Sequence, residues 1–123
     1  MRRIYIAGPL SPKGLRPEAP HPTIEYLMNV RDMVQAAIVC IERGWAPFCP
    51  ALDFMYFMCL PFGMSISEDK CKGVSMAWLE ASDAILLVGN WTKSRGVLAE
   101  RDRAIDLGIP IYGSLDDVPR FDT

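Results

Sequence analysis

The stretch Ser82-Asp-Ala-Ile-Leu-Leu-Val88 decides the fold of this chain. Its five apolar residues form a continuous run, which is what a strand needs when both of its faces are covered. A polar loop follows over residues 89–95, and residues 96–107 then show a helical pattern that stops at Gly108. A further short apolar run, residues 109–112, predicts another strand. The end of the chain therefore has the order strand, helix, strand.

The first half of the chain continues this alternation of strands and helices. A run of strand-forming side chains at residues 3–7 is stopped by Gly8-Pro9. The pattern then predicts a proline-rich loop over 10–22, a long helix that ends at Gly44, a short strand over 45–49 and a helix over 70–82.

The long helix carries a clear apolar pattern. We expect Thr23 to cap it, with Glu25 in its first turn. Its apolar residues recur at steps of three and four, which predicts one face packed against the core. These residues are Ile24, Leu27, Met28, Val34, Ile38 and Ile41.

Strands that alternate with helices predict parallel pairing through right-handed crossovers. We therefore expect one α/β domain over residues 1–123, a small doubly wound parallel sheet that is flavodoxin-like or Rossmann-like, with helices on both faces. Ligands of such sheets bind at the carboxyl ends of the strands. The loops expected there are Gly8–Ser11, Pro50–Asp53 and Gly89–Gly96.

Composition excludes several classes of protein. Of the 123 residues, 50% are hydrophobic and 23% are charged, which is the balance of a soluble globular domain and not of a disordered one. No apolar run approaches the roughly 18 residues of a membrane span, and no signal peptide is visible. A net charge of −2 without a basic block argues against a nucleic-acid polymer as partner.

The cysteines and the single histidine do not suggest a metal site. No two of the four cysteines form a C-x-x-C pair, and His21 stands alone in the proline-rich loop. Cys40 is expected to be a small buried hydrophobe. Without an export signal, we expect free thiols and a cytoplasmic location.

Residues 51–64 are strongly apolar, rich in aromatic side chains and methionine, and follow neither the helical nor the strand period. One interpretation is a loop or short helix that packs into the core. The other is a wall of a ligand site or a contact surface of a dimer. The sequence leaves both open.

The loops at the expected ligand edge contain the candidate site residues. Ser94 falls at the start of the last long helix, where free N–H groups and the helix dipole favour an anion, although a serine there also caps helices. Glu100 lies one turn further, and its side chain leans back toward the loop. It is a candidate nucleophile or general base. The remaining candidates for substrate binding are Gly8, Pro9, Ser11, Asp53, Asn90 and Gly96.

These motifs together resemble the nucleoside 2-deoxyribosyltransferase-like superfamily. The matching pieces are Tyr5-Ile-Ala-Gly-Pro9, Ser82–Val88, Ser94–Glu100 and the stretch from Ala104 to Pro110. Within the superfamily the chain is most similar to the short DUF4406-type members, and it also resembles the 2'-deoxynucleoside 5'-monophosphate N-hydrolases.

The resemblance implies a mechanism and roles for single residues. Glu100 matches the family glutamate that attacks the anomeric carbon and forms a glycosyl-enzyme ester, and Tyr5 matches the tyrosine that orients it. Ser94 matches the serine that binds the 5'-phosphate in the monophosphate hydrolases, and Ser11 is expected to add a phosphate contact. The implied function is an N-glycosidase that cleaves the base–sugar bond of a (deoxy)nucleoside 5'-monophosphate.

One position departs from the family pattern. The aspartate expected eight residues before Asp83, which assists the leaving base, is replaced by Ser75, and a serine is no general acid at neutral pH. Asp53, Asp69 and Glu80 are candidates to take over that role. Two further functions therefore stay open: a deoxyribosyltransferase, and a nucleotide-binding protein without turnover.

The resemblance also bears on partners. Family members are usually dimers or larger, in which a neighbour's residues complete the site, so we expect a homodimer or higher homo-oligomer that binds a small nucleotide or nucleoside. Neither a metal nor an organic cofactor is expected, because glycosyl transfer through a carboxylate needs none. The polar tail that runs to Thr123 is expected to be ordered by a partner.

Overall fold

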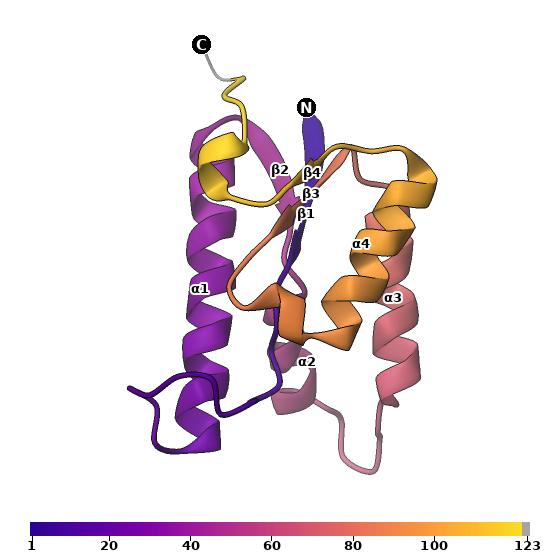
Figure 1. The fold of residues 1–123 in the computed structure, drawn as a ribbon. Helices are drawn as coiled ribbons and strands as arrows, with labels where there is room; N and C mark the ends of the chain where they lie inside the picture. Colours follow the sequence, from indigo (N-terminus) through magenta and orange to yellow (C-terminus); the bar gives the residue numbers. More distant parts are fainter. Residues whose placement is uncertain (122–123) are drawn as a thin grey trace.

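The computed structural model describes residues 1–121, and in them a four-stranded parallel sheet has the order β2-β1-β3-β4 (Figure 1). This order places the first strand between the second and the third, as in flavodoxin-like sheets. The expected α/β fold with a doubly wound parallel sheet is confirmed. The strands are β1 (Arg2–Ala7), β2 (Trp45–Phe48), β3 (Ala84–Leu87) and β4 (Ile111–Tyr112).

The two central strands are the most buried part of the chain. β1 pairs with β3 in a parallel register that sets Ile4 against Ala84 and Ile6 against Leu86. Every residue of β3 is buried, which is why its sequence is apolar without alternation. β2 contains Pro47 and tolerates it because this strand lies at an edge of the sheet, where one side needs no ladder partner.

Helices cover both faces of the sheet, as expected (Figure 1). The helix α1 (Pro22–Glu42) lies on one face, and α3 (Glu68–Glu80) and α4 (Arg95–Leu107) lie side by side on the other. Alternate side chains of β1 lie on opposite faces of the sheet. Ile4 and Ile6 pack in the core on the α1 side. Tyr5 and Ala7 pack in the core on the side of α3 and α4. Short elements complete the chain: 3-10 turns at Pro50–Asp53, Trp91–Lys93 and Leu115–Asp117, and the helix α2 (Phe54–Met58).

The start of α1 differs from the expectation. The N-cap is His21, whose Nδ1 accepts the Thr23 N–H at 3.2 Å, so the prediction that Thr23 caps the helix is wrong. Pro22 occupies the first helical position, where its missing N–H costs nothing.

The predicted buried face of α1 is also wrong. Ile24, Leu27, Ile38 and Ile41 are exposed, and the buried residues lie on the opposite side of the helix. In the second half of the helix small side chains let the axis come close to the sheet, while the larger side chains of the other face remain outside. In the first half the buried polar side chains bond to the proline-rich loop. The buried residues of α1 are Glu25, Asn29, Met33, Ala36, Ala37 and Cys40.

The C-terminal tail packs on its own chain and needs no second molecule to order it. Val118 is buried in the core beside α1. The Trp45 indole N–H donates to the Pro119 carbonyl at 2.8 Å, and the Arg43 guanidinium donates to the carbonyls of Leu115 and Val118. The expectation of a tail ordered by a partner is therefore corrected for residues up to 121; residues 122 and 123 lie outside the described chain.

Two further observations on residues 1–121 concern the state of the cysteines and the length and polarity of the helices. The four cysteines carry free thiols, and Cys40 is fully buried as expected, which raises the pKa of its thiol to about 11. None of the helices in this part of the chain is long and apolar enough to cross a membrane.

Candidate active site

A cavity of about 930 Å³ opens at the carboxyl ends of the strands. This volume is near the upper end of the roughly 300–1,000 Å³ of small-molecule sites. The three loops expected at this edge all contribute to its wall, together with α1, α3 and α4. Nine of the ten candidate residues line it: Tyr5, Gly8, Pro9, Ser11, Asp53, Ser75, Ser94, Gly96 and Glu100.

Glu100 is the most unusual group in this cavity. It lies in the second turn of α4, and burial raises the pKa of its carboxyl from 4.5 to about 7. Its Oε2 is buried and has no hydrogen-bond partner among residues 1–121. A buried polar oxygen without a partner is costly for folding and is typical of a group kept for chemistry or for a ligand.

Tyr5 and Ser75 surround this carboxyl. The Tyr5 hydroxyl is a donor group beside Glu100, and its proximity offsets part of the rise in the Glu100 pKa. The pKa of Tyr5 itself is raised by burial and by the charge of Glu100, so its hydroxyl keeps its proton and remains a donor. Ser75 interacts with the same hydroxyl from α3. β1, α3 and α4 therefore each supply one member of a tyrosine, serine and glutamate cluster.

A second carboxyl group lines the cavity from the segment after β2. Asp53 ends the 3-10 turn there, and its side chain does not cap the start of α2. Partial burial raises the pKa of this carboxyl, and its charge in turn contributes to the raised pKa of Tyr26. Asp53 is thus close enough to act on groups inside the cavity. Asp69 and Glu80, which the sequence also allowed as proton donors, do not line it.

The apolar segment 51–64 is mostly a surface and not a core. Phe54 and Phe57 line the cavity. The ligand-wall interpretation therefore fits part of the segment, whereas the core-packing one holds only for Ala51, which is fully buried. The exposed large side chains are Leu52, Met55, Tyr56, Phe57, Met58, Phe62 and Met64.

The amino end of α4 supplies hydrogen-bond donors to the cavity. Ser94 is the N-cap, and its Oγ accepts the Val97 N–H at 3.3 Å. The first helical bond runs from the Leu98 N–H to the Ser94 carbonyl, so the N–H groups of Arg95 and Gly96 have no acceptor within the helix. A Cβ added at Gly96 would meet only the Ser94 Oγ, at 3.9 Å, so the space beside these donors is open.

Several positive side chains around the cavity were missed in the sequence. Lys13, Lys72, Lys93 and Arg95 all contribute to its wall. They come from a loop, from α3, from the turn before α4 and from the first residue of α4. Their common location favours an anionic ligand. Lys93 and Arg95 flank Ser94, where the sequence indicated an anion, whereas no sequence pattern connects Lys13 and Lys72 with that position.

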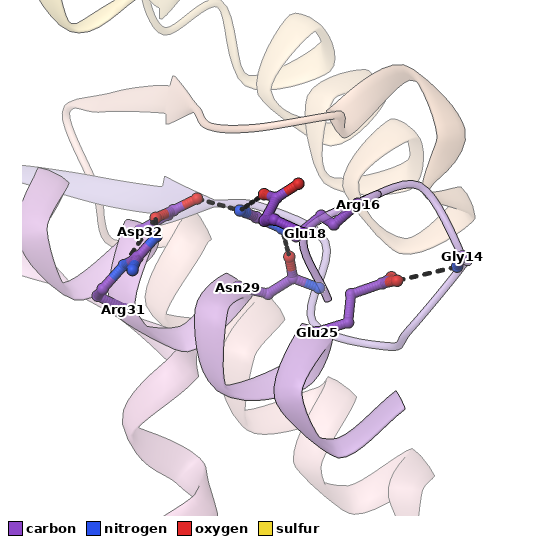
Figure 2. A network of polar contacts seen from close by, with 7 residues as sticks. All are labelled: Gly14, Arg16, Glu18, Glu25, Asn29, Arg31 and Asp32. Carbon is purple, nitrogen blue, oxygen red and sulfur yellow. Dashed lines mark hydrogen bonds and ion pairs between the residues drawn. The ribbon is translucent and has the colours of Figure 1, made fainter. Parts of the chain in front are cut away.

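Part of the cavity rim is held in place by α1. The buried Glu25 carboxylate accepts the backbone N–H groups of Lys13 and Gly14, and Asn29 donates to the Leu10 carbonyl. Figure 2 shows how Arg16 joins this network by contacting Asn29 and the acids around it. The proline-rich loop that follows β1 is therefore pinned to the helix at several points. The apolar pattern of α1 predicted a different buried face, so the part that Glu25 and Asn29 play in holding the loop was missed.

Two candidate residues behave differently from the rest. Asn90 is exposed and does not line the cavity. Gly8 lines the cavity, but close packing leaves no room for a side chain at this position. An added Cβ would lie 3.0 Å from Met33 Cγ and 3.3 Å from the Val88 carbonyl oxygen. Among residues 1–121, no group of three or more histidine, cysteine, aspartate or glutamate side chains is placed to hold a metal ion.

Comparison with known proteins assigns the chain to a family. Residues 2–112 match the family described as "Domain of unknown function (DUF4406)", and the chain belongs to this family. Neither the comparison with curated proteins nor that with solved structures gave a match.

Proposed function

We propose that the protein is an N-glycosidase that cleaves the base–sugar bond of a (deoxy)nucleoside 5'-monophosphate. The observation that carries the proposal is the buried Glu100 Oε2, which has no hydrogen-bond partner in the described chain and lies in a cavity of about 930 Å³. The resemblance to the nucleoside 2-deoxyribosyltransferase-like superfamily supports the same role for Glu100, Tyr5 and Ser94.

The proposed reaction is a double displacement at the anomeric carbon. The ionised Glu100 carboxylate attacks this carbon and forms an ester with the sugar, while the bond to the base breaks and its electron pair stays on the base nitrogen. Water then adds to the anomeric carbon, passes a proton to the Asp53 carboxylate left by the first step, and releases the sugar phosphate and the Glu100 carboxylate. The Tyr5 hydroxyl, held protonated by burial and by the Glu100 charge, orients the nucleophile in both steps.

The leaving base takes up a proton, and Asp53 is the group we assign to this transfer. It lines the same cavity, and partial burial raises the pKa of its carboxyl, which favours a carboxylic acid that can donate. Ser75 cannot take this role, since a hydroxyl is too weak an acid. The aromatic rings of Phe54 and Phe57 form a wall on which a base can stack.

The phosphate belongs at the amino end of α4 in this proposal. Ser94 and the N–H groups of Arg95 and Gly96 provide donors, and the positive end of the helix dipole adds its field. Lys93 lines the cavity beside them and adds a positive charge. A nucleoside without a phosphate would leave these groups unpaired, so we expect monophosphates to be preferred.

The decisive experiment is base release from a panel of ribo- and deoxynucleoside 5'-monophosphates, followed by chromatography. We expect one or a few of them to lose the base in the wild type, and Glu100→Gln to lower the rate by about a thousandfold or more. Asp106→Asn, which removes an exposed carboxylate on the same helix, is the matched control and should leave the rate unchanged. Release that survives Glu100→Gln would contradict the proposed nucleophile.

Ser75 favours a second candidate, a nucleotide-binding protein without turnover. This candidate predicts that a monophosphate raises the melting temperature while no base is released. The Ser75→Asp variant then tests whether the wild type lacks only a general acid. Base release in that variant and not in the wild type would mean that the serine at position 75 is the reason for the missing activity. Transfer of the sugar to an added second base, in place of release to water, would identify a deoxyribosyltransferase.

The proposal extends to location and assembly. We infer a cytoplasmic enzyme, because the four cysteines are free thiols, as is common in a reducing compartment. We also infer a homo-oligomer, in line with the superfamily resemblance and with the exposed apolar side chains of the chain.

A further inference from the structure

The outer face of α1 is an apolar surface that no part of residues 1–121 covers. Leu27, Ile38 and Ile41 are 53%, 57% and 60% exposed, and Ile24 is 44% exposed. Val34, in the same row, is partly buried because it also packs against the core of its own chain. A row of large aliphatic side chains along one helix costs free energy in water, so a partner surface is expected for it.

The spacing of this row indicates what kind of surface covers it. The positions 24, 27, 31, 34, 38 and 41 follow steps of three, four, three, four and three. One step of three and one of four together make seven residues, which is the heptad repeat of a seam between two helices packed along their length. The helix has 21 residues and is therefore about 30 Å long, so the row runs along most of it. A second helix of similar length fits this row.

We propose that the outer face of α1 binds the same face of a second copy of this chain, with the two α1 helices antiparallel. A two-fold axis beside the middle of the row then places Ile24 against the partner's Ile41 and Leu27 against the partner's Ile38. All the large side chains of the row gain apolar neighbours in this register. The contact is isologous, so it closes after two copies.

Arg31 decides between the antiparallel and the parallel arrangement. It is the only charged residue in the row, and it forms an ion pair with Asp32 at 3.2 Å. In a parallel pair each Arg31 would face its own copy, and two like charges would meet in the seam. In the antiparallel register Arg31 lies against the partner's Val34, so its aliphatic stem covers an apolar side chain and its guanidinium stays with Asp32.

The charge around the row favours a second copy over a membrane surface. The positions that flank the row are Thr23, Met28, Val30, Gln35, Ala37 and Glu42. Glu42 is the only charged one, and it pairs with Arg120 of its own chain at 2.9 Å. Helices that lie on membranes carry lysine and arginine beside their apolar face, and this face has one arginine. A nearly uncharged and self-complementary face suits its own copy.

The exposed side chains after β2 show no comparable pattern. Met55, Tyr56, Met58 and Phe62 are as exposed as the α1 row, but they follow no helical period, and the short α2 has five residues. Their neighbours Phe54 and Phe57 line the cavity. We therefore place the contact between copies on α1 and not on this segment.

Sedimentation velocity over a range of concentrations tests the contact. We expect the wild type to be a dimer at micromolar concentration, and Ile38→Lys to weaken dimerisation at least a hundredfold. Ile105→Lys is the matched control, because Ile105 on α4 is 58% exposed and lies outside the row. The control should remain dimeric, and both variants should keep the wild-type circular dichroism, since neither position is buried.

Cysteine cross-linking tests the antiparallel register. In a background with Cys59→Ser and Cys71→Ser, chains with Leu27→Cys are mixed with chains with Ile38→Cys and oxidised gently. We expect a covalent dimer in the mixture and little in either chain alone. Covalent dimers in each chain alone would show a parallel pair and overturn the proposed register.

Three results would overturn the proposal itself. The first is a wild type that is monomeric at every concentration. The second is a dimer that persists in Ile38→Lys and is lost in Phe62→Lys, which would assign the contact to the segment after β2. The third is a wild-type monomer that sediments with anionic phospholipid vesicles and is released by Ile38→Lys, which would assign the face to a membrane. None of these outcomes is read from base release, so failure of this contact and failure of the proposed activity are distinguishable.

Discussion

At the level of single residues, Glu100 combines burial, a neighbouring donor and an oxygen without a partner in the described chain. Burial raises the pKa of its carboxyl to about 7, so close to half of the molecules carry the carboxylate at neutral pH. A nucleophile must be ionised, and base release through Glu100 should therefore increase from pH 6 to pH 8. A decrease over the same range would mean that the limiting step needs a protonated carboxyl, which is either Asp53 or Glu100, and not an ionised Glu100.

The same pKa makes a prediction about stability. The folded chain holds the Glu100 proton up to about pH 7, whereas the unfolded chain releases it near 4.5, so the free energy of unfolding falls as the pH rises through this window. One pKa unit corresponds to about 1.4 kcal/mol, so the free energy of unfolding falls by at most ~3 kcal/mol. Partial exposure of Glu100 reduces this fall to about 1–2 kcal/mol. Glu100→Gln removes this loss and should be more stable than the wild type at pH 8.

Urea unfolding at pH 5 and pH 8 measures this effect. The stability of the wild type should drop between the two pH values by more than that of Glu100→Gln, and Asp106→Asn should follow the wild type. A parallel change in all three proteins would mean that burial of Glu100 does not raise its pKa.

At the level of elements, the amino end of α4 presents donors beside an open space. Gly96 lies in the first turn of this helix, and an added Cβ would find room. Gly96→Ala should therefore stabilise the protein by about 0.5–1 kcal/mol, because alanine loses less backbone entropy in a helix. The methyl group would occupy space next to the N–H donors, so the affinity for a nucleoside monophosphate should fall at least tenfold.

Thermal unfolding and calorimetric titration with the monophosphates measure the two effects of Gly96→Ala separately. Gly73→Ala on α3 is the control, since Gly73 also lies in a helix with open space around it and does not line the cavity. It should stabilise the protein without changing affinity. Equal affinities in both variants would place the phosphate elsewhere.

The network between α1 and the proline-rich loop allows a prediction for the cavity rim (Figure 2). Glu25→Ala leaves the N–H groups of Lys13 and Gly14 without their acceptor, which costs about 1–3 kcal/mol. The loop should open, and trypsin should cut after Lys13 faster than in the wild type. Glu18→Ala removes only a surface ion pair with Arg16 and should leave both the stability and the cleavage rate unchanged. Similar cleavage of both variants would argue against an anchor at Glu25.

At the level of the whole molecule, the C-terminal tail closes the core on the α1 side of the sheet. Val118 is buried there, and Val118→Ala should lower the free energy of unfolding by about 1–2 kcal/mol in the isolated chain. Asp116→Ala, in the exposed turn just before it, should have almost no effect. Urea unfolding of the two variants checks this, and equal stabilities would mean that the tail contributes nothing without a partner.

The sequence alone predicted the alternation of strands and helices, the doubly wound parallel sheet and the end of α4 at Gly108. These features follow from local rules: an apolar run favours a buried strand, and glycine adopts the left-handed conformation that ends a helix, with a φ of 70° at Gly108. Parallel pairing then brings the carboxyl ends of the strands to one edge, so most of the candidate residues could be placed around one cavity.

The tertiary structure alone decided which face of α1 is buried, how Glu25 and Asn29 hold the loop, and where the tail packs. It also decided the burial that raises the pKa of Glu100. Local periodicity marks an apolar stripe on a helix, but it does not say whether that stripe meets the sheet or solvent. This choice depends on the shape of the surface that the helix packs against and on hydrogen bonds between residues far apart in the chain, such as those from Arg43 and Trp45 to the tail.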